Sequence, residues 1–102
     1  MDEIQYRASR LFKVLANPLT YQVVTLLRGG DARPSEIAAS LGRPMTSIVR
    51  VGRELKIAEV ISFESDRVGL HGRRVRYRLK NPALAGILDS AEVWVLNSSV
   101  ER

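Results

Sequence analysis

Two arginines and a threonine in the segment 44–58 have the spacing of side chains that share one face of a helix. At 100° per residue, Thr46, Arg50 and Arg53 fall within about 40° of a common direction. The opposite face carries small and apolar residues, at Ile48, Val51, Gly52 and Leu55. An arginine can donate two hydrogen bonds to the O6 and N7 acceptors of guanine, and a threonine can bond a base or touch the methyl group of thymine. The pattern predicts a helix that buries one side and presents the other to the major groove of DNA.

The residues of this helix are expected to make different kinds of contact. Arg50 has two open interpretations, contact with a base edge or contact with a phosphate. Arg53 is expected to bind phosphate, because the first half of a recognition helix lies deepest in the groove. The candidate DNA contacts of this helix and of the turn before it are Arg43, Thr46, Ser47, Arg50 and Arg53.

A second basic group lies in the segment 67–80, where polar and apolar residues alternate as they do in a β-strand. Glycines at positions 69 and 72 predict the tip of a hairpin before this strand. Near the tip few acids are present, and we expect the basic residues there to grip the backbone or the minor groove of DNA. These residues are Arg67, His71, Arg73 and Arg74.

The net charge is concentrated in the same part of the chain. The stretch Arg43–Lys80 holds ten Lys or Arg and four Asp or Glu, so it carries +6, whereas the remaining residues carry −1, for a net charge of +5. A localised basic segment is typical of a surface that binds a polyanion, whereas a merely solvated surface would scatter both signs. Part of the charge is expected to be neutralised by cross-strand ion pairs rather than by phosphate. These pairs would join Arg76 and Arg78 to Glu64 and Asp66.

Hydrophobic periodicity places these side chains in a fold that is mainly α with a small β-hairpin. Helices are predicted at 4–15, 18–27, 34–41, 44–58 and 82–98, and strands at 61–64 and 74–80. A residue before proline avoids the helical region, so Asn17-Pro18 separates the first two helices, and Gly42 is expected to end the third in a left-handed conformation. The third and fourth helices with the hairpin form a winged helix-turn-helix, in the order ααααββα. Residues 1–102 are predicted to form one domain.

The composition argues against several other classes of function. With no cysteine, the chain has no disulfide, thiolate metal site or thiol redox chemistry. The one histidine, His71, has no second ligand nearby in sequence, so no metal and no cofactor are expected. No nucleophile–base pair or glycine-rich phosphate loop is visible, so the chain is not expected to be an enzyme. No secretory signal and no apolar stretch of bilayer length is visible, so a cytoplasmic location without membrane contact is expected.

Three stretches of the sequence resemble the ArsR/SmtB-type winged-helix repressors. They are Val14–Leu19, which contains a Leu-Ala-Asn-Pro junction, Glu36–Gly42, and Gly72–Leu79. Members of that family are homodimers that are joined through their first and last helices and that bind inverted-repeat operators. The resemblance, which covers about residues 10–95, therefore implies dimerisation helices at 1–16 and 82–98. The residues expected at the dimer interface are Leu11, Leu84, Ile87, Leu88, Ala91, Trp94 and Val95.

The chain departs from the metal-sensing members of that family at both of their well-known sites. Ala38 and Ser40 stand where those proteins carry a Cys-x-Cys pair. The last helix offers Asp89 and Glu92 but no histidine. These two acids could share a cation with a symmetry mate, although a solvated helix face is the favoured interpretation. A small organic ligand, a partner protein or no effector at all would each fit this pattern.

Together these patterns predict a DNA-binding transcriptional regulator, in the simplest case a repressor, that acts as a homodimer on a palindromic operator and does not sense metals through cysteine. Two-fold pairing doubles the number of phosphate contacts. The alternative is a winged helix that serves as a protein-interaction module in a larger assembly, with its last helix as the docking face. RNA is a poorer fit, because side chains cannot read its deep and narrow major groove.

Overall fold

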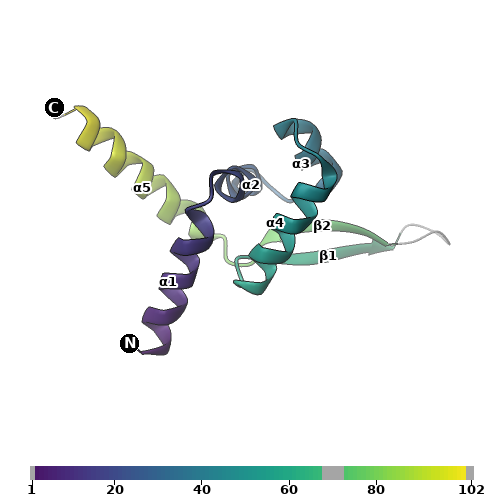
Figure 1. Cartoon of the computed structure of the whole chain (residues 1–102), viewed down its shortest axis with the longest axis horizontal. Helices are drawn as coiled ribbons and strands as arrows, with labels where there is room; N and C mark the ends of the chain where they lie inside the picture. The colour runs from purple at the N-terminus through teal and green to yellow at the C-terminus, as the bar shows by residue number, and fades with distance from the viewer. Residues whose placement is uncertain (1, 68–72, 101–102) are drawn as a thin grey trace.

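The computed structural model describes residues 2–67 and 73–100, and the elements within these ranges follow the expected order (Figure 1). Four helices come first, α1 (Glu3–Leu15), α2 (Pro18–Arg28), α3 (Pro34–Leu41) and α4 (Met45–Ile57). An antiparallel hairpin follows, with strands β1 (Ile61–Arg67) and β2 (Arg73–Leu79), and then a last helix, α5 (Ala83–Val100). The fold is a winged helix-turn-helix, and this prediction is confirmed.

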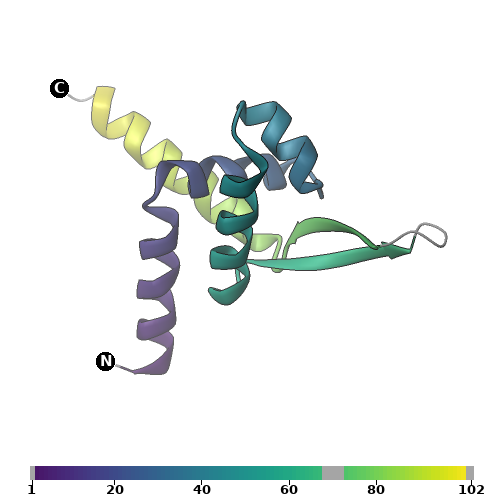
Figure 2. The same ribbon diagram turned by 45° about the vertical axis from the view of Figure 1, so that its right-hand side comes forward.

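The helices α2, α3 and α4 form the centre of the molecule, and the other elements extend from it in two directions. Figures 1 and 2 show the hairpin on one side, and α1 and α5 as two separate arms on the other. No helix in the described ranges is long and apolar enough to cross a membrane. The arrangement leaves both arms with large surfaces that no other part of the described chain covers.

Short polar and glycine residues set the helix boundaries. Asn17 caps α2, because its Oδ1 accepts hydrogen bonds from the backbone N–H groups of Leu19 (2.9 Å) and Thr20 (3.3 Å). Gly42 ends α3 with φ +61°, a left-handed conformation that glycine adopts at little cost, as predicted. Helix α4 begins at Met45, and the carbonyl oxygen of Pro44 accepts its first backbone hydrogen bond, from Ser47 at 3.1 Å.

The hairpin is longer towards its tip than the sequence predicts. The register runs from Ile61 opposite Leu79 to Arg67 opposite Arg73, so β1 continues three residues beyond the expected end at Glu64. The prediction was wrong there because Ser65–Arg67 have low intrinsic strand propensity, whereas pairing with β2 supplies the hydrogen bonds that hold them extended. A further bridge joins Ala32 to Tyr77 through two backbone hydrogen bonds of 2.7 and 3.1 Å, which ties the α2–α3 loop to the hairpin.

One core contact joins the hairpin to α4. Tyr77 is only 3% exposed and stacks on Phe63, with ring centroids 4.8 Å apart. Its ring also lies directly against the backbone of Gly52. A Cβ atom at position 52 would lie 2.4 Å from the Tyr77 hydroxyl oxygen and 2.5 Å from the adjacent ring carbon, closer than real Cβ contacts allow. Position 52 therefore needs glycine, although glycine is a weak helix former in mid-helix.

Replacing this glycine is expected to destabilise the fold. Gly52→Ala would gain up to about 1 kcal/mol from helix propensity. Forcing a methyl group into a packed core costs about 1–3 kcal/mol, and here the ring that must move is itself stacked. We expect the variant to unfold at a lower urea concentration than the parent protein.

Gly86→Ala is the matched control, because an added Cβ at this exposed position of α5 would have nothing within 4 Å in the described chain. This substitution is expected to leave the urea midpoint unchanged or to raise it. Equal midpoints for the two alanine variants would contradict the proposed close contact.

Candidate nucleic-acid interface

Helix α4 presents the expected polar ridge to solvent. Its inner face is buried, with Ile48 and Leu55 at 0% exposure and Val51 at 2%. Thr46, Arg50 and Arg53 are all exposed on the outer face. The helical-wheel prediction therefore agrees with the structure. An amphipathic helix packs its apolar stripe against the hydrophobic core and leaves its polar face in solvent.

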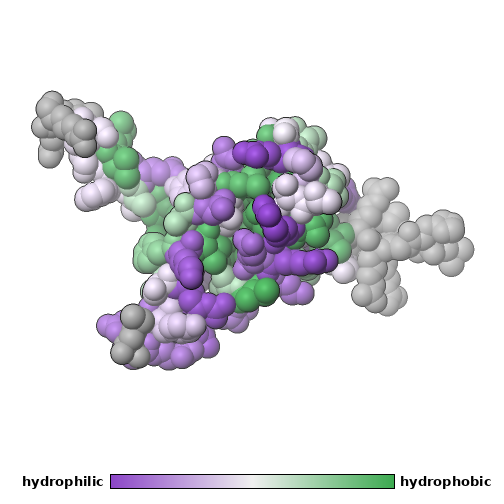
Figure 3. Space-filling view, in the orientation of Figure 1, coloured by the Kyte–Doolittle hydropathy of each residue, from purple (hydrophilic) through white to green (hydrophobic). Residues whose placement is uncertain are grey.

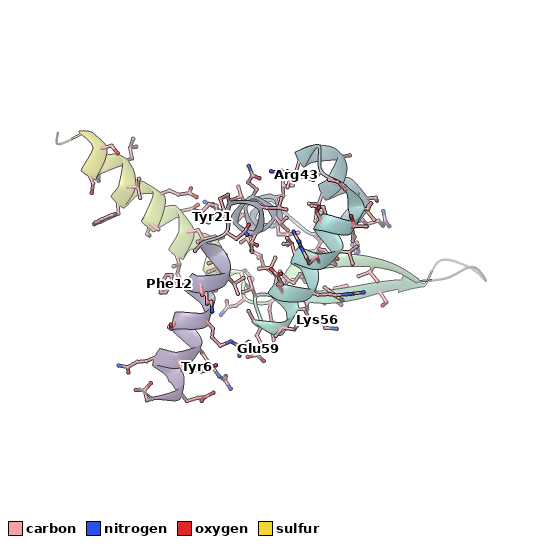
Figure 4. The ribbon with its side chains drawn as sticks, in the orientation of Figure 1. Tyr6, Phe12, Tyr21, Arg43, Lys56 and Glu59 are labelled. Atoms are coloured by element: carbon pink, nitrogen blue, oxygen red, sulfur yellow. The ribbon has the colours of Figure 1, made fainter. Side chains whose placement is uncertain are left out.

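The residues next to this ridge extend it at the start of α4. Arg43 is exposed in the turn between α3 and α4, where Figure 4 labels it, and Ser47 is half-buried. Met45 is also exposed, at 46%, and was not among the predicted contacts. Because Met45 opens α4 beside Thr46, it places an apolar side chain where a thymine methyl group could be met.

Lys56 adds a positive charge where α4 meets the hairpin. Its Nζ lies 4.5 Å from the centre of the Phe63 ring, a cation–π contact between α4 and β1. Figure 4 shows Lys56 at the end of α4 opposite Arg43. The sequence carries no signal for this contact, since the partner ring belongs to another element.

Part of the positive charge on the hairpin is engaged by acids of the same chain. Arg78 lies 3.8 Å from Glu64 on β1 and 3.8 Å from Asp31 in the α2–α3 loop. This agrees with the expectation of ion pairing for Arg78, although its partner is diagonal, because Ser62 stands directly opposite in the register. Arg76 stands opposite Glu64 in the same register.

The predicted contacts at the hairpin tip are only partly placed. The backbones of Arg67, Arg73 and Arg74 lie in the paired strands, but the structure does not describe their side chains. His71 lies outside the described residues altogether. These four residues remain predictions.

The hydroxyl group of Tyr77, buried beneath α4, is influenced by the charge of Arg53 on the exposed face of the same helix. Burial raises the pKa of the Tyr77 hydroxyl, and the positive charge of Arg53 acts in the opposite direction. The hydroxyl is therefore neutral at physiological pH, and Arg53 itself is exposed on α4.

The predicted dimer residues of α5 separate into two groups. Leu84 and Leu88 are buried in the protein's own core, at 8% and 5% exposure, so they leave little surface for a partner chain. Ile87 and Trp94, in contrast, are exposed, at 54% and 70%. Ala91 and Val95 are exposed as well, and Leu11 on α1 is half-buried.

Several exposed apolar residues were absent from the predicted dimer surface. Figure 3 shows hydrophobic side chains along the arm that α5 forms. Val93 and Leu96 are 55% and 62% exposed there, and on α1 Ile4 and Phe12 are 74% and 66% exposed. The sequence did carry a signal for this apolar surface, the four consecutive apolar residues Val93–Leu96. Such a run points to all sides of a helix, so some of its side chains must lie outside the protein's own core.

The two carboxylates of α5 are held by an arginine. Arg28, in the last turn of α2, donates from Nη1 to Glu92 Oε2 (2.7 Å) and from Nη2 to Glu92 Oε1 (3.0 Å), and Nη2 also contacts Asp89. The Tyr21 hydroxyl donates to Glu92. The favoured interpretation, a solvated helix face, agrees with the exposure of both acids, and the cation that they share is Arg28 of the same chain, 61–64 residues away in sequence, rather than one held with a symmetry mate. In the described ranges no group of three or more His, Cys, Asp or Glu could hold a metal ion.

The fold matches solved structures of regulatory proteins. The homodimeric winged helix-turn-helix DNA-binding domain of Mb0332 from Mycobacterium bovis, described as a possible ArsR-family transcriptional regulator, is 26% identical, with a TM-score of 0.76 over 96% of this chain and 85% of that one. The cadmium metal-sensor CMTR from Mycobacterium tuberculosis is 27% identical, with a TM-score of 0.66 over 80% of each chain. Rv0081 from M. tuberculosis shares the fold, with a TM-score of 0.81 and 20% identity over 100% of this chain and 98% of that one.

These matches confirm the resemblance to ArsR/SmtB-type winged-helix regulators at the level of structure. They also agree with the expectation that the chain is not an enzyme, since the fold is that of a family of transcription regulators. No protein-family model and no curated protein matches the sequence. The assignment to this type of fold therefore rests on the similarity to solved structures.

The Arg28 contacts predict a specific response to acid. Hydrogen bonds, first from Arg28 and then from Tyr21, hold the pKa of Glu92 at about 2, below its usual 4.5. A carboxylate whose pKa is lowered by folding stabilises the fold fully above its unfolded pKa, and this contribution is lost as the pH falls through the folded value. Glu92→Gln should therefore lower the urea midpoint most above about pH 4.5, and the difference from the parent should vanish towards pH 2.

Glu3→Gln is the matched control, because Glu3 pairs with Arg7 on the open surface of α1, where both side chains are more than 60% exposed. Exposed pairs of this kind contribute little, so its midpoint should follow that of the parent at every pH. A Glu92→Gln effect that does not depend on pH would contradict the assignment.

Proposed function

We propose that this winged helix-turn-helix chain of the ArsR type is a DNA-binding transcriptional regulator that acts as a homodimer on a palindromic operator, in the simplest case as a repressor. The observation that carries the proposal is the ridge of Thr46, Arg50 and Arg53 on α4. Its side chains are exposed, while the opposite face of the same helix is entirely buried. A helix fixed in this way can enter a major groove as a rigid reader.

The hydroxyl and guanidinium groups on the ridge suit contact with base edges and phosphates of duplex DNA. Thr46 and Arg50 lie in the first half of α4, the part that enters a groove most deeply in helix-turn-helix proteins. Arg53 follows about one turn later and Lys56 about two turns later, where phosphates would flank the groove. The hairpin extends outward from beside α4, which suits contact with the DNA backbone next to the groove (Figure 2).

Homodimerisation is supported by the exposed apolar surface of the two arms. Ile87, Trp94 and Phe12 are each more than half exposed, and exposed apolar surface of this kind is typical of protein–protein interaction sites. The domain of Mb0332 is described as homodimeric. A two-fold axis between such arms would present two α4 helices to half-sites about one helical turn, roughly 34–36 Å, apart.

The proposed regulator does not sense metals through cysteine, because the chain contains none. The two acids of α5 are engaged by Arg28, so they are poor ligands for an effector cation. A small organic ligand, a partner protein or no effector would each fit the chain. Selection of bound fragments from genomic DNA, with and without added metals, is expected to give a palindromic consensus that metals do not alter.

The contacts of α4 can be tested by their different effects on DNA binding. Loss of a bidentate contact to guanine costs about 1–3 kcal/mol, so Arg50→Ala is expected to weaken operator binding and relax base preference at one position of each half-site. Arg53→Ala should weaken binding to all sequences alike and lower the slope of log K against log salt by about 0.9 for each phosphate that it no longer neutralises. Fluorescence anisotropy at several salt concentrations measures both effects.

Arg7→Ala on α1 is the control for charge, and it is expected to change neither the base preference nor the salt slope appreciably. Affinity of the parent protein that stays flat from low to high salt would contradict DNA binding. Retained function in Arg50→Glu with Arg53→Glu, together with loss of function in Trp94→Ala, would instead favour the protein-interaction module.

The dimer surface is tested by shortening one exposed aromatic side chain. Trp94→Ala removes the largest exposed apolar group of α5, and large buried aromatic residues dominate interface energies. The dimer is expected to dissociate at a protein concentration at least about tenfold higher than for the parent, a change of about 1.4 kcal/mol. Ile57→Ala on α4, which is 69% exposed, is the control and should dimerise normally in sedimentation equilibrium.

A further inference from the structure

Helix α5 is anchored to the rest of the protein over a short length. Leu84 and Leu88, one turn apart, are its buried residues in the described chain, and both belong to the shared core. From Asp89 to Ser99 every residue is exposed. Two leucines on one stripe fix where the helix sits, but they resist rotation and tilt about that point only weakly.

A polar cluster lies just beyond this anchor and joins α5 to α2. It consists of Arg28 and Tyr21 on α2 and of Asp89 and Glu92 on α5, and we refer to it as the Arg28 clamp. The guanidinium binds both oxygens of Glu92 in a two-pronged geometry, which defines direction as well as distance. The Arg28 side chain is only 14% exposed, whereas the side chains of Asp89 and Glu92 are 66% and 48% exposed, so solvent screens these pairs in part.

Helix α2 connects the Arg28 clamp to α4 through the hydrophobic core. Its buried residues Val23, Val24 and Leu27 share one core with Ile48 and Leu55 of the recognition helix. A close-packed core transmits displacement, since it does not deform continuously. The direction of α5 relative to α4 is thus set at two places, the leucine anchor and the Arg28 clamp.

We propose that the Arg28 clamp is a positioning device that sets the distance between the two recognition helices of the dimer, and so selects the spacing of operator half-sites. The proposal rests on the homodimer proposed above. If α5 lies at the two-fold axis, any tilt of α5 against α2 moves the two α4 helices in opposite directions. One added base pair moves a half-site by about 3.4 Å and rotates it by about 35°, so a modest tilt changes which spacing fits.

The distance between the recognition helices can be measured without DNA. The chain has no cysteine, so Glu54→Cys introduces one exposed attachment point for a spin label on α4. Pulsed electron paramagnetic resonance on the full-length dimer then reports the label-to-label distance. In the Glu54→Cys background, Arg28→Gln should broaden or shift this distribution, whereas Arg7→Gln, the charge-matched control, should leave it as it is.

The same variants are then tested on operator spacing. The palindrome selected by the parent protein is synthesised with one to three base pairs added or removed at its centre. The parent is expected to lose about tenfold or more in affinity at a displacement of two base pairs, which rotates a half-site by about 70°. Arg28→Gln should flatten this profile while its affinity for a single half-site stays equal to that of Arg7→Gln.

Each result separates the clamp from the proposed function. An unchanged distance distribution in a dimeric Arg28→Gln variant overturns the clamp proposal alone. The absence of any distance between protomers in the parent refutes the homodimer and the clamp together. A changed distribution in Arg28→Gln, when the parent binds no palindrome, supports the clamp and refutes the proposed function. A retained spacing profile despite a changed distance shows that the clamp does not select the operator.

Tyr21→Phe provides a milder variant in case Arg28→Gln does not fold. It removes only the hydroxyl that donates to Glu92, and leaves the guanidinium pair in place. We expect a smaller broadening of the distance distribution, in the same direction as for Arg28→Gln. No broadening in a folded Tyr21→Phe dimer, with Arg28→Gln unfolded, would overturn the proposal.

Discussion

The close approach of the Tyr77 ring to the backbone of Gly52 is the contact on which the rest of the structure depends. Tyr77 belongs to β2, is bonded through its backbone to Ala32, and stacks on Phe63 of β1. The same ring touches the middle of α4, so the hairpin, the α2–α3 loop and the recognition helix meet at one side chain. A bulkier residue at position 52 would separate the helix from the hairpin, and the two surfaces that we propose to bind DNA would no longer be held in a fixed arrangement.

With α4 and the hairpin packed together in this way, the basic segment Arg43–Lys80 divides into parts with different roles. The exposed ridge on α4 has no ion pair with an acid among the described residues, so its charge is open to an external phosphate. Arg78, by contrast, is engaged by Glu64 and Asp31 and helps to hold the hairpin against the core. Because opposite charges at such distances largely cancel, the total of +6 overstates the charge that DNA would meet.

The two arms differ from this pattern, since α5 is mainly apolar, whereas α1 carries exposed apolar residues beside charged ones. Residues 89–99 of α5 are all exposed in the single chain, and the Arg28 clamp lies where the helix leaves the core. The two acids of α5, Asp89 and Glu92, are thus paired with one cation of the same chain, Arg28. An ion pair between α2 and α5 suits a regulator in which the orientation of α5 is set by the fold itself rather than by a bound metal.

The sequence by itself determined the element types and the direction in which α4 faces, because both follow from local rules. Apolar residues at helical spacing, the Asn17-Pro18 junction and the left-handed Gly42 predict helices and their ends without knowledge of the remainder of the chain. The tertiary structure alone decided the features that join distant segments: the glycine at position 52, the Lys56 contact with Phe63, the burial of Leu84 and Leu88, and the Arg28 clamp. A pattern read along the chain cannot show these contacts, because each depends on a partner in another element whose position only the packed core defines.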